Sequence, residues 1–385
     1  MKKTVIALAA MIAASSSALA ADVTVYGKVD LGFTYTNADS ESAKTESFQL
    51  DSGKNSGSRW GLKGREDLGD GYAVAFQLES GFSADTGASG QGGRLFGREA
   101  RLSFETPVAT ISAGRMGGLT SGIGTFDVFQ STGDALDGGW DYNFNVGNWF
   151  SRDRYDNMLT VNSANLAGFT LYAQYSFGTD STAKGPDEKT LIKNDGVQNN
   201  RNTERYVAVG ATYENGPLAV GLFLDSVLYR YNTEGDKTRH DSDAKAVSFS
   251  ASYDFDVAKV FFGAQYGKNE SLNFFTTTVG HDDVAKKAIG GLYDGYRIGV
   301  GASTQLPCGT LTGGVYYGDM KKEVVGEKDT TAKNFNIAIG HTYPFSKRTY
   351  SYVGVAYKSV DVTKGSDKLA EEDSFTTQVG LVHSF

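Results

Sequence analysis

Apolar and polar residues alternate with a period of two along most of this chain. In the stretch DVTVYGKVDLGFTYT, Val25, Leu31 and Phe33 fall on one face. Lys28 and Asp30 fall on the other face. Because successive side chains of a strand point to opposite sides, this pattern predicts strands with one apolar and one polar surface. Segments of this kind, about sixteen in all, lie at 22–36, 58–68, 71–83, 95–106, 108–115, 153–164, 167–178, 203–214, 217–231, 244–255, 257–268, 293–305, 309–319, 332–345, 348–361 and 374–385.

The links between these segments alternate in length. Short links at 67–71, 214–217, 254–256, 306–309 and 345–347 alternate with long ones at 37–57, 84–94, 116–152, 179–202, 232–243, 269–292, 320–331 and 362–372. All long loops therefore lie on one side. Strands of about ten residues with this loop asymmetry are typical of outer-membrane barrels, whose closed sheet satisfies every backbone group within lipid. We predict an all-β fold, a transmembrane antiparallel β-barrel of about 16 strands.

The two ends of the chain agree with this prediction. Residues 1–20, MKKTVIALAAMIAASSSALA, combine two lysines, a short apolar stretch and a small-residue ending, which predicts a secretory signal peptide. The barrel domain is then 21–385. No later apolar run is long enough for a transmembrane helix. The final strand keeps its alternation up to Phe385.

Composition excludes several classes of function. Removal of the signal peptide takes two lysines with it and changes the formal net charge from −8 to −10, which disfavours nucleic acid as a partner. Cys308 is the single cysteine, so no intramolecular disulfide can form. The four histidines are scattered without metal-ligand spacing, and no catalytic arrangement can be assigned. We expect no enzyme activity, cofactor or metal site.

A series of short motifs follows one order along the chain: DVTVYGKVDLGF, GSRWGLKGREDLGDGYAVAFQLE, LFGREARLSF, AGRM, YENGPLAVG, YPFSKRTYSYVGVAY and a terminal phenylalanine. In this order and spacing the chain resembles the general diffusion porins of Gram-negative outer membranes over essentially its whole mature length. The resemblance implies a sixteen-stranded barrel in outer-membrane lipid, assembly as a homotrimer, and a loop folded into the lumen. It also implies that Phe385 is an assembly signal for the barrel-insertion machinery.

The segment that matches this loop is residues 116–151, which is much longer than an ordinary connection. It carries Asp127, Asp134, Asp137 and Asp141 but no lysine or arginine. A barrel of sixteen strands is wide enough for an aqueous channel, so a loop folded inside would form its constriction. Without the resemblance, a solvated acidic surface loop remains the alternative.

Periodicity then predicts a basic wall opposite the loop. In SRWGLKGRED, Trp60 and Leu62 occupy the lipid face, which turns Arg59, Lys63 and Arg65 inward.

Arg101 and Arg154 are turned inward by the same argument, whereas Arg98 is formally outward unless it lies past the edge of the bilayer. Arg59, Arg101 and Arg154 also match the basic constriction ladder of the family by their places before WGLKG, within RLSF and after the long loop. Arginines facing carboxylates across a narrow gap would orient dipolar solutes and bias ion entry.

These features predict an outer-membrane porin, a water-filled channel for passive diffusion of ions and small hydrophilic solutes. The alternative is an outer-membrane barrel enzyme or adhesin with a closed lumen. The acidic net charge and the inward basic residues give opposite indications for ion selectivity, which therefore stays open.

Overall fold

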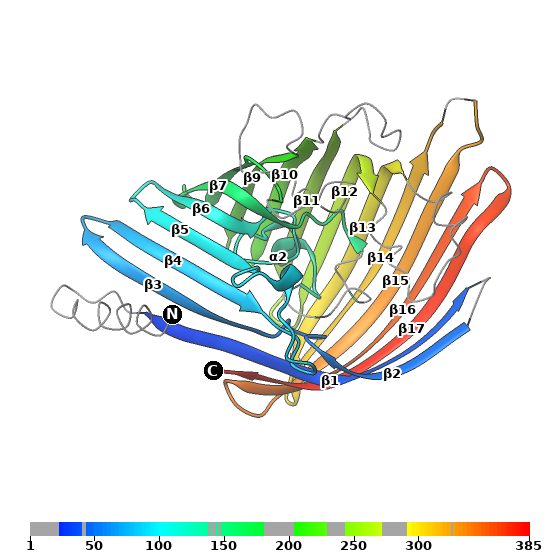
Figure 1. Cartoon of the computed structure of the whole chain (residues 1–385), viewed down its shortest axis with the longest axis horizontal. Helices are drawn as coiled ribbons and strands as arrows, with labels where there is room; N and C mark the ends of the chain where they lie inside the picture. Colours follow the sequence, from blue (N-terminus) through cyan, green and yellow to red (C-terminus); the bar gives the residue numbers. More distant parts are fainter. Residues whose placement is uncertain are drawn as a thin grey trace, which may run out of the picture.

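The computed structural model describes residues 23–40, 44–137, 140, 144, 148–180, 204–228, 243–271, 291–324 and 326–385. These residues form one antiparallel sheet that closes on itself (Figure 1). Its strands are β1 (Thr24–Ser40), β2 (Lys44–Ser52), β3 (Arg59–Gly69), β4 (Tyr72–Gly81), β5 (Glu99–Glu105), β6 (Ala109–Gly117), β7 (Arg154–Ser163), β8 (Phe169–Ser176), β9 (Arg205–Asn215), β10 (Leu218–Leu228), β11 (Ala244–Asp254), β12 (Lys259–Ser271), β13 (Leu292–Leu306), β14 (Gly309–Lys322), β15 (Thr330–Pro344), β16 (Thr349–Lys364) and β17 (Asp367–Ser384). Two short helical turns complete the described elements, the 3₁₀ turn η1 (Gln91–Gly93) and α2 (Phe129–Gly133).

The ring closes where β1 meets β17, with Leu31 opposite Leu381. On its other edge, β1 pairs with β3 near its start and with β2 farther along, from Leu31 opposite Ser52 to Asp39 opposite Lys44. Because β2 and β3 follow one another along the same edge, the seventeen described segments occupy sixteen positions around the ring. The predicted sixteen-stranded barrel is confirmed.

Two predicted long links are shorter than expected. The link at 37–57 contains β2, whose alternation in TESFQLDS lengthens the hairpin with β1. The link at 362–372 is a tight turn, because β16 runs to Lys364 and β17 begins at Asp367. Gly365 takes a φ of 61° there, a conformation that glycine adopts without steric cost. These hairpins are therefore longer than their apolar segments.

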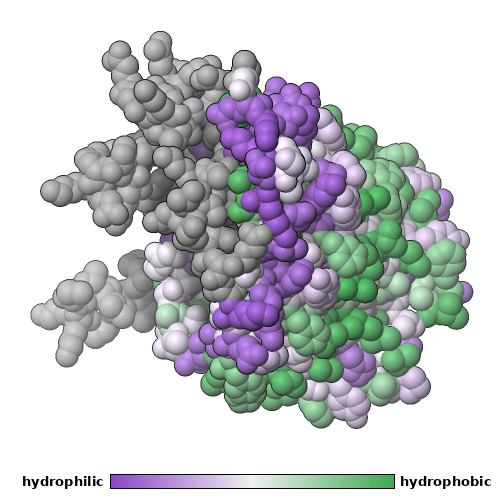
Figure 2. Space-filling model, turned by 90° about the vertical axis from the view of Figure 1, so that its right-hand side faces the viewer, coloured by the Kyte–Doolittle hydropathy of each residue, from purple (hydrophilic) through white to green (hydrophobic). Residues whose placement is uncertain are grey.

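The outer face of the ring is apolar. Trp60, Leu102, Phe104 and Leu159, which the pattern predicts on the lipid side, are 37%, 58%, 42% and 38% exposed. Figure 2 shows hydrophobic residues gathered over the outer wall and a band of hydrophilic residues along one end of it. Such a surface suits the hydrocarbon layer of a membrane.

The chain end belongs to the ring. Phe385 and Gly27 exchange backbone hydrogen bonds, each N–H donating to the other carbonyl at 3.0 Å. A side chain at Gly27 would collide with the Phe385 ring, so glycine is required where the two chain ends meet. In the described ranges, no helix is long and apolar enough to cross a membrane.

Candidate functional site: the charged interior of the barrel

The chain between β6 and β7 crosses the interior of the ring, and α2 packs there against β10, β11 and β12 (Figure 1). Near its start, the backbone N–H of Leu119 donates to Gln174 Oε1 at 3.0 Å. Near its end, the N–H of Phe150 donates to Gln265 Oε1 at 2.7 Å. These contacts come from two separate strands, β8 and β12, so the described part of the loop is held inside the barrel.

Aromatic side chains fix the loop against one wall. Trp149 packs edge-on against Tyr316 of β14, with ring centroids 5.7 Å apart. Trp140 packs edge-on against Tyr352 of β16 at 5.8 Å. A Cβ at Gly340 would collide with the Trp140 indole, so the strands leave space for it with glycine. The loop therefore narrows the lumen from the β10–β16 side.

Asp134 also helps to hold the loop against this wall. Tyr316 donates its hydroxyl proton to Asp134 Oδ1 and the Trp149 indole donates to Oδ2, each at 2.6 Å. The carboxylate is 3% exposed. Burial raises the pKa of Asp134, and the hydrogen bonds from Tyr316 and Trp149 oppose that rise.

A buried ion cluster holds the other end of the loop. The Arg152 guanidinium donates to Asp225 Oδ1 of β10 at 2.5 Å and to both oxygens of Glu270 of β12 at 2.7 and 2.8 Å. Burial alone would lower the pKa of Arg152, but the charges of Asp225 and Glu270 outweigh it and raise the pKa. The guanidinium is therefore held charged, and two strands share it.

Between the loop and the β3–β7 wall lies a cavity of about 500 Å³. Its charged lining combines three arginines with four carboxylates: Arg59, Arg98, Arg154, Glu79, Glu99, Asp127 and Asp137. The arginines and glutamates come from the barrel wall, and the aspartates come from the loop. Opposite charges thus face one another across the remaining space.

Arginines and glutamates of the wall form ion pairs and hydrogen bonds with one another. Arg98 donates to Glu79 Oε1 at 2.7 Å, and Arg59 Nε lies 3.6 Å from Glu79 Oε2. Arg101 donates to Glu99 Oε1 at 2.7 Å. Arg154 is 8% exposed, and its Nε and Nη2 atoms lack a hydrogen-bond partner within the described part of the chain.

The loop contributes a pair of neighbouring carboxylates. Asp127 is partly enclosed, and desolvation there raises its pKa well above the usual range. The adjacent Asp137 carboxylate raises it further, because two like charges at close range disfavour double ionisation. Asp127 therefore tends to hold a proton beside Asp137.

The structure separates the site residues that the sequence had grouped. Arg59 and Arg154 line the cavity with Asp127 and Asp137, whereas Asp134 lies behind the loop surface.

Arg101 and Lys63 also lie outside the set that lines the cavity. The Arg101 guanidinium stands 5.7 Å from the Phe126 ring, next to the cavity lining. Lys63 lies nearer the short-turn rim, opposite Thr24 and 5.2 Å from the Tyr26 ring. Their roles in permeation stay predictions.

Arg98 lies outside the strands, so its formal outward assignment does not apply. It precedes β5 in irregular backbone, where strand alternation no longer applies, and its side chain enters the cavity. Glu79 is also missing from the predicted wall, although the alternation of YAVAFQLES in β4 places it on the same face as Gln77. Asp141, His240 and His281 lie outside the described residues. Across the ranges that the structure describes, no group of three or more metal-ligating side chains occurs.

The closed sheet, its apolar outer wall and its charged interior define a membrane channel. The chain belongs to the Gram-negative porin family, whose model matches residues 7–363. An outer membrane porin protein of Bordetella pertussis is 30% identical over 417 residues, covering 100% of both chains.

Two solved structures share the fold. An anion-selective porin from Comamonas acidovorans aligns with a TM-score of 0.67 and 22% identity, over 95% of this chain and 100% of that chain. A trimer form of OmpT from Vibrio cholerae aligns with a TM-score of 0.55 and 15% identity, over 95% and 100%. The chain is an outer-membrane porin that forms a channel for passive diffusion, as the sequence predicts.

Proposed function

We propose that the cavity between the loop and the β3–β7 wall is the constriction of the channel, and that ions and small hydrophilic solutes pass through it. The observation that carries this proposal is the placement of Arg59, Arg98 and Arg154 across one space from Asp127 and Asp137. Separated positive and negative charges create a field across the pore, which orients water and dipolar solutes. A solute crosses by turning its dipole into that field.

Ion preference follows from the balance of these charges. Three guanidinium groups remain charged at any working pH, because arginine is not deprotonated in proteins. One of the four carboxylates, Asp127, tends to hold a proton because its pKa is raised by desolvation and by the neighbouring Asp137. The constriction therefore changes its preference with small changes in charge, and neutralising the arginines moves it toward cations.

We also propose that the chain works as a homotrimer in outer-membrane lipid. The trimer form of a protein with the same fold supports this assembly. The terminal Phe385, half-exposed beside Gly27, is accessible to the barrel-insertion machinery as an assembly signal.

The first test is the current through purified protein in a planar bilayer under a potassium chloride gradient. The wild-type protein is expected to show large ohmic steps that close in multiples of three. Arg59→Gln combined with Arg154→Gln removes two positive charges from the constriction. Removing one unit charge changes the energy of an ion about 4 Å away by ~1 kcal/mol in water, with opposite sign for cations and anions, so each replacement shifts the cation-to-anion permeability ratio toward cations by at least about fivefold.

The matched control is Arg65→Gln. Arg65 lies on the same strand as Arg59, but it does not line the cavity, and its Nε lies 2.9 Å from Glu105 Oε2. This variant is expected to keep the wild-type reversal potential. Equal shifts in the two variants would contradict the proposed position of the constriction. Absence of conductance from folded protein would contradict the channel mechanism.

A further inference from the structure

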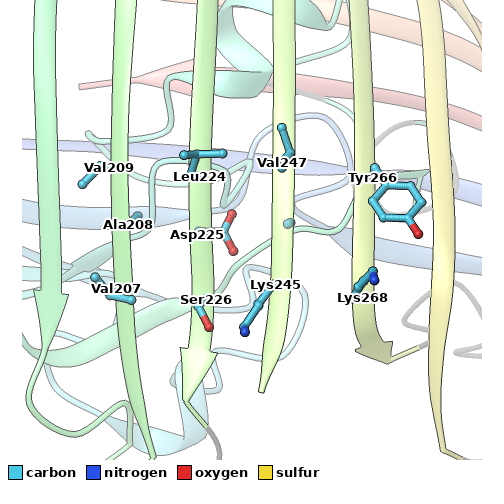
Figure 3. A pocket seen from close by; sticks show the side chains of 11 residues that line it. Val207, Ala208, Val209, Leu224, Asp225, Ser226, Lys245, Val247, Tyr266 and Lys268 are labelled. Carbon is cyan, nitrogen blue, oxygen red and sulfur yellow. The ribbon is translucent and has the colours of Figure 1, made fainter. Parts of the chain in front are cut away.

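The outer wall carries a groove of about 460 Å³ across β9 to β12 (Figure 3). Its floor includes Ala208 and Ala246, which are 2% and 4% exposed. Val209, Leu224 and Val247 line it and are 49%, 47% and 45% exposed. The groove is therefore an apolar depression in the surface that faces lipid, and it is separate from the pore.

Two lysines stand at one end of this groove. Lys245 of β11 and Lys268 of β12 are directly opposite in the strand register, and both are exposed. Figure 3 shows them at the same end of the groove as Ser226. Like charges at directly opposite positions of an antiparallel pair repel one another and destabilise it. This placement therefore has an electrostatic cost.

Neither lysine forms an ion pair with a carboxylate of the described residues. Among the described residues, neither ammonium group has an ion-pair or hydrogen-bond partner. Asp225 lies in the same part of the wall, but its carboxylate binds Arg152 on the inner side. Asp294 on the neighbouring strand β13 accepts a hydrogen bond from the backbone N–H of Asn269 at 2.8 Å.

Other outward lysines near the long-loop rim differ in this respect. Lys321 lies 2.8 Å from Asp329 and 2.9 Å from Glu323. Lys333 lies 3.8 Å from Asp319. Within the described part of the chain, Lys245 and Lys268 thus form a positive pair without an ion-pair partner, whereas Lys321 and Lys333 are paired.

The groove lies at one interface of the membrane. Tyr266 is 49% exposed and lies opposite the exposed Tyr296, so the two rings mark the aromatic belt at the membrane interface. Lys268 lies two residues beyond Tyr266 toward the long-loop rim, at the level of lipid head groups. Along β11 the groove is lined from Lys245 to Val247, roughly 7 Å of strand, so it takes the head group of a lipid and the adjoining part of a chain.

We propose that this groove binds a phosphate-bearing lipid of the outer leaflet. One acyl chain lies along Val209, Leu224 and Val247, and the phosphate lies between Lys245 and Lys268. Long loops of outer-membrane barrels face the outside, which assigns the lysine end to the outer leaflet. A lipid phosphate supplies the negative charge that the described protein residues lack, and its chain covers the apolar surface below.

Native mass spectrometry of the folded, delipidated protein in uncharged detergent tests this site, with dipalmitoyl phosphatidate as the probe and dipalmitoylglycerol as its uncharged counterpart. The wild-type protein is expected to retain phosphatidate in preference to dipalmitoylglycerol. Lys245→Gln with Lys268→Gln is expected to weaken phosphatidate binding on the order of fivefold for each lysine removed. Val247→Trp fills the groove and is expected to weaken binding of phosphatidate while both lysines remain.

Matched controls distinguish binding at this site from non-specific effects of surface charge and hydrophobicity. Lys321→Gln with Lys333→Gln removes two paired rim lysines and is expected to leave phosphatidate binding unchanged. Val315→Trp fills a second outer groove, of about 750 Å³ and without a lysine in its lining, and is also expected to have no effect. Equal losses in test and control variants would overturn the proposal. A changed oligomeric state with unchanged lipid binding would instead assign the groove to a contact between copies and would also overturn it.

Discussion

At the scale of single residues, carboxylates of one loop have different tasks. Asp134 is buried and receives hydrogen bonds from Tyr316 and Trp149, so it holds the loop to the wall. Asp127 and Asp137 line the cavity, where they add negative charge. The sequence placed all three in one acidic loop, but strand periodicity carries no information about orientation inside an irregular segment. Only the packing of the loop separates the anchor from the lining.

Acidification is expected to make the channel more anion-selective before surface carboxylates titrate. Desolvation and Asp137 raise the pKa of Asp127, so this pair takes up a proton at a higher pH than the ordinary value near ~4. The constriction then loses one negative charge as the pH falls. Reversal potentials measured at stepwise lower pH check this shift.

The same linkage has a stability counterpart. Because the folded pKa of Asp127 is raised, its contribution to stability is present below the unfolded pKa and is lost as the pH rises through the folded pKa.

Asp127→Asn should abolish the early pH step in selectivity and leave the later titration of surface groups. An unchanged step in that variant would assign it to another group.

At the scale of elements, the loop between β6 and β7 is held at both ends and along its middle. Arg152 joins its last residues to β10 and β12, and aromatic rings join its middle to β14 and β16. The length and acidity of the loop were visible in the sequence. Its partners were not, because Asp225, Glu270 and Tyr352 are distant in the chain and resemble other inward residues of their strands.

Arg152→Met is expected to loosen the loop strongly. It leaves Asp225 and Glu270 as buried, uncompensated charges, which costs about 3–5 kcal/mol. Limited proteolysis of the folded barrel, with single-channel noise as a second readout, measures the release of the loop. Adding Asp225→Asn and Glu270→Gln to Arg152→Met should restore most of the protection, and failure to do so would show that the charges are not the cause.

Gly340→Leu is expected to displace Trp140 from the wall. The indole occupies the space where a side chain at this position would stand, so the larger residue forces the middle of the loop into the pore or out of it. Single-channel conductance should change while heat-modifiability shows an intact barrel. The control is Gly69→Leu at the rim of the barrel. A side chain at Gly69 meets no other atom, but the φ of 86° strains any residue other than glycine. This variant therefore shows the effect of losing a glycine without displacing Trp140.

At the scale of the whole molecule, the ring depends on the contact between the two chain ends. β1 and β17 pair over almost their full length, and Phe385 extends that pairing to Gly27. Alternation up to the final residue predicted a closing strand at this place. Closure also explains how the wall can face lipid, since no sheet edge is left exposed to it.

Deletion of Phe385 is expected to slow assembly and weaken closure. It removes the two backbone hydrogen bonds with Gly27 and the half-exposed ring that covers this glycine, whose apolar contact is worth roughly half of the ~1.5–3 kcal/mol of a fully buried phenylalanine. The folded fraction on heat-modifiability gels is the measurement. Phe385→Tyr keeps the ring and should assemble nearly normally. A defect in cells that is absent from unaided refolding in vitro would indicate recognition by the insertion machinery.

The sequence by itself determined the barrel, the approximate number of its strands, the lipid-facing side of each and the position of the long loop. Alternation with a period of two is a local property, and the requirement that lipid imposes on backbone groups leaves a closed sheet as the solution. Tertiary structure decided which charges meet. Arg98, Glu79 and the aspartates come from separate segments, and their approach depends on how the loop packs inside the ring. The same holds for Lys245 and Lys268, whose adjacency follows from strand register.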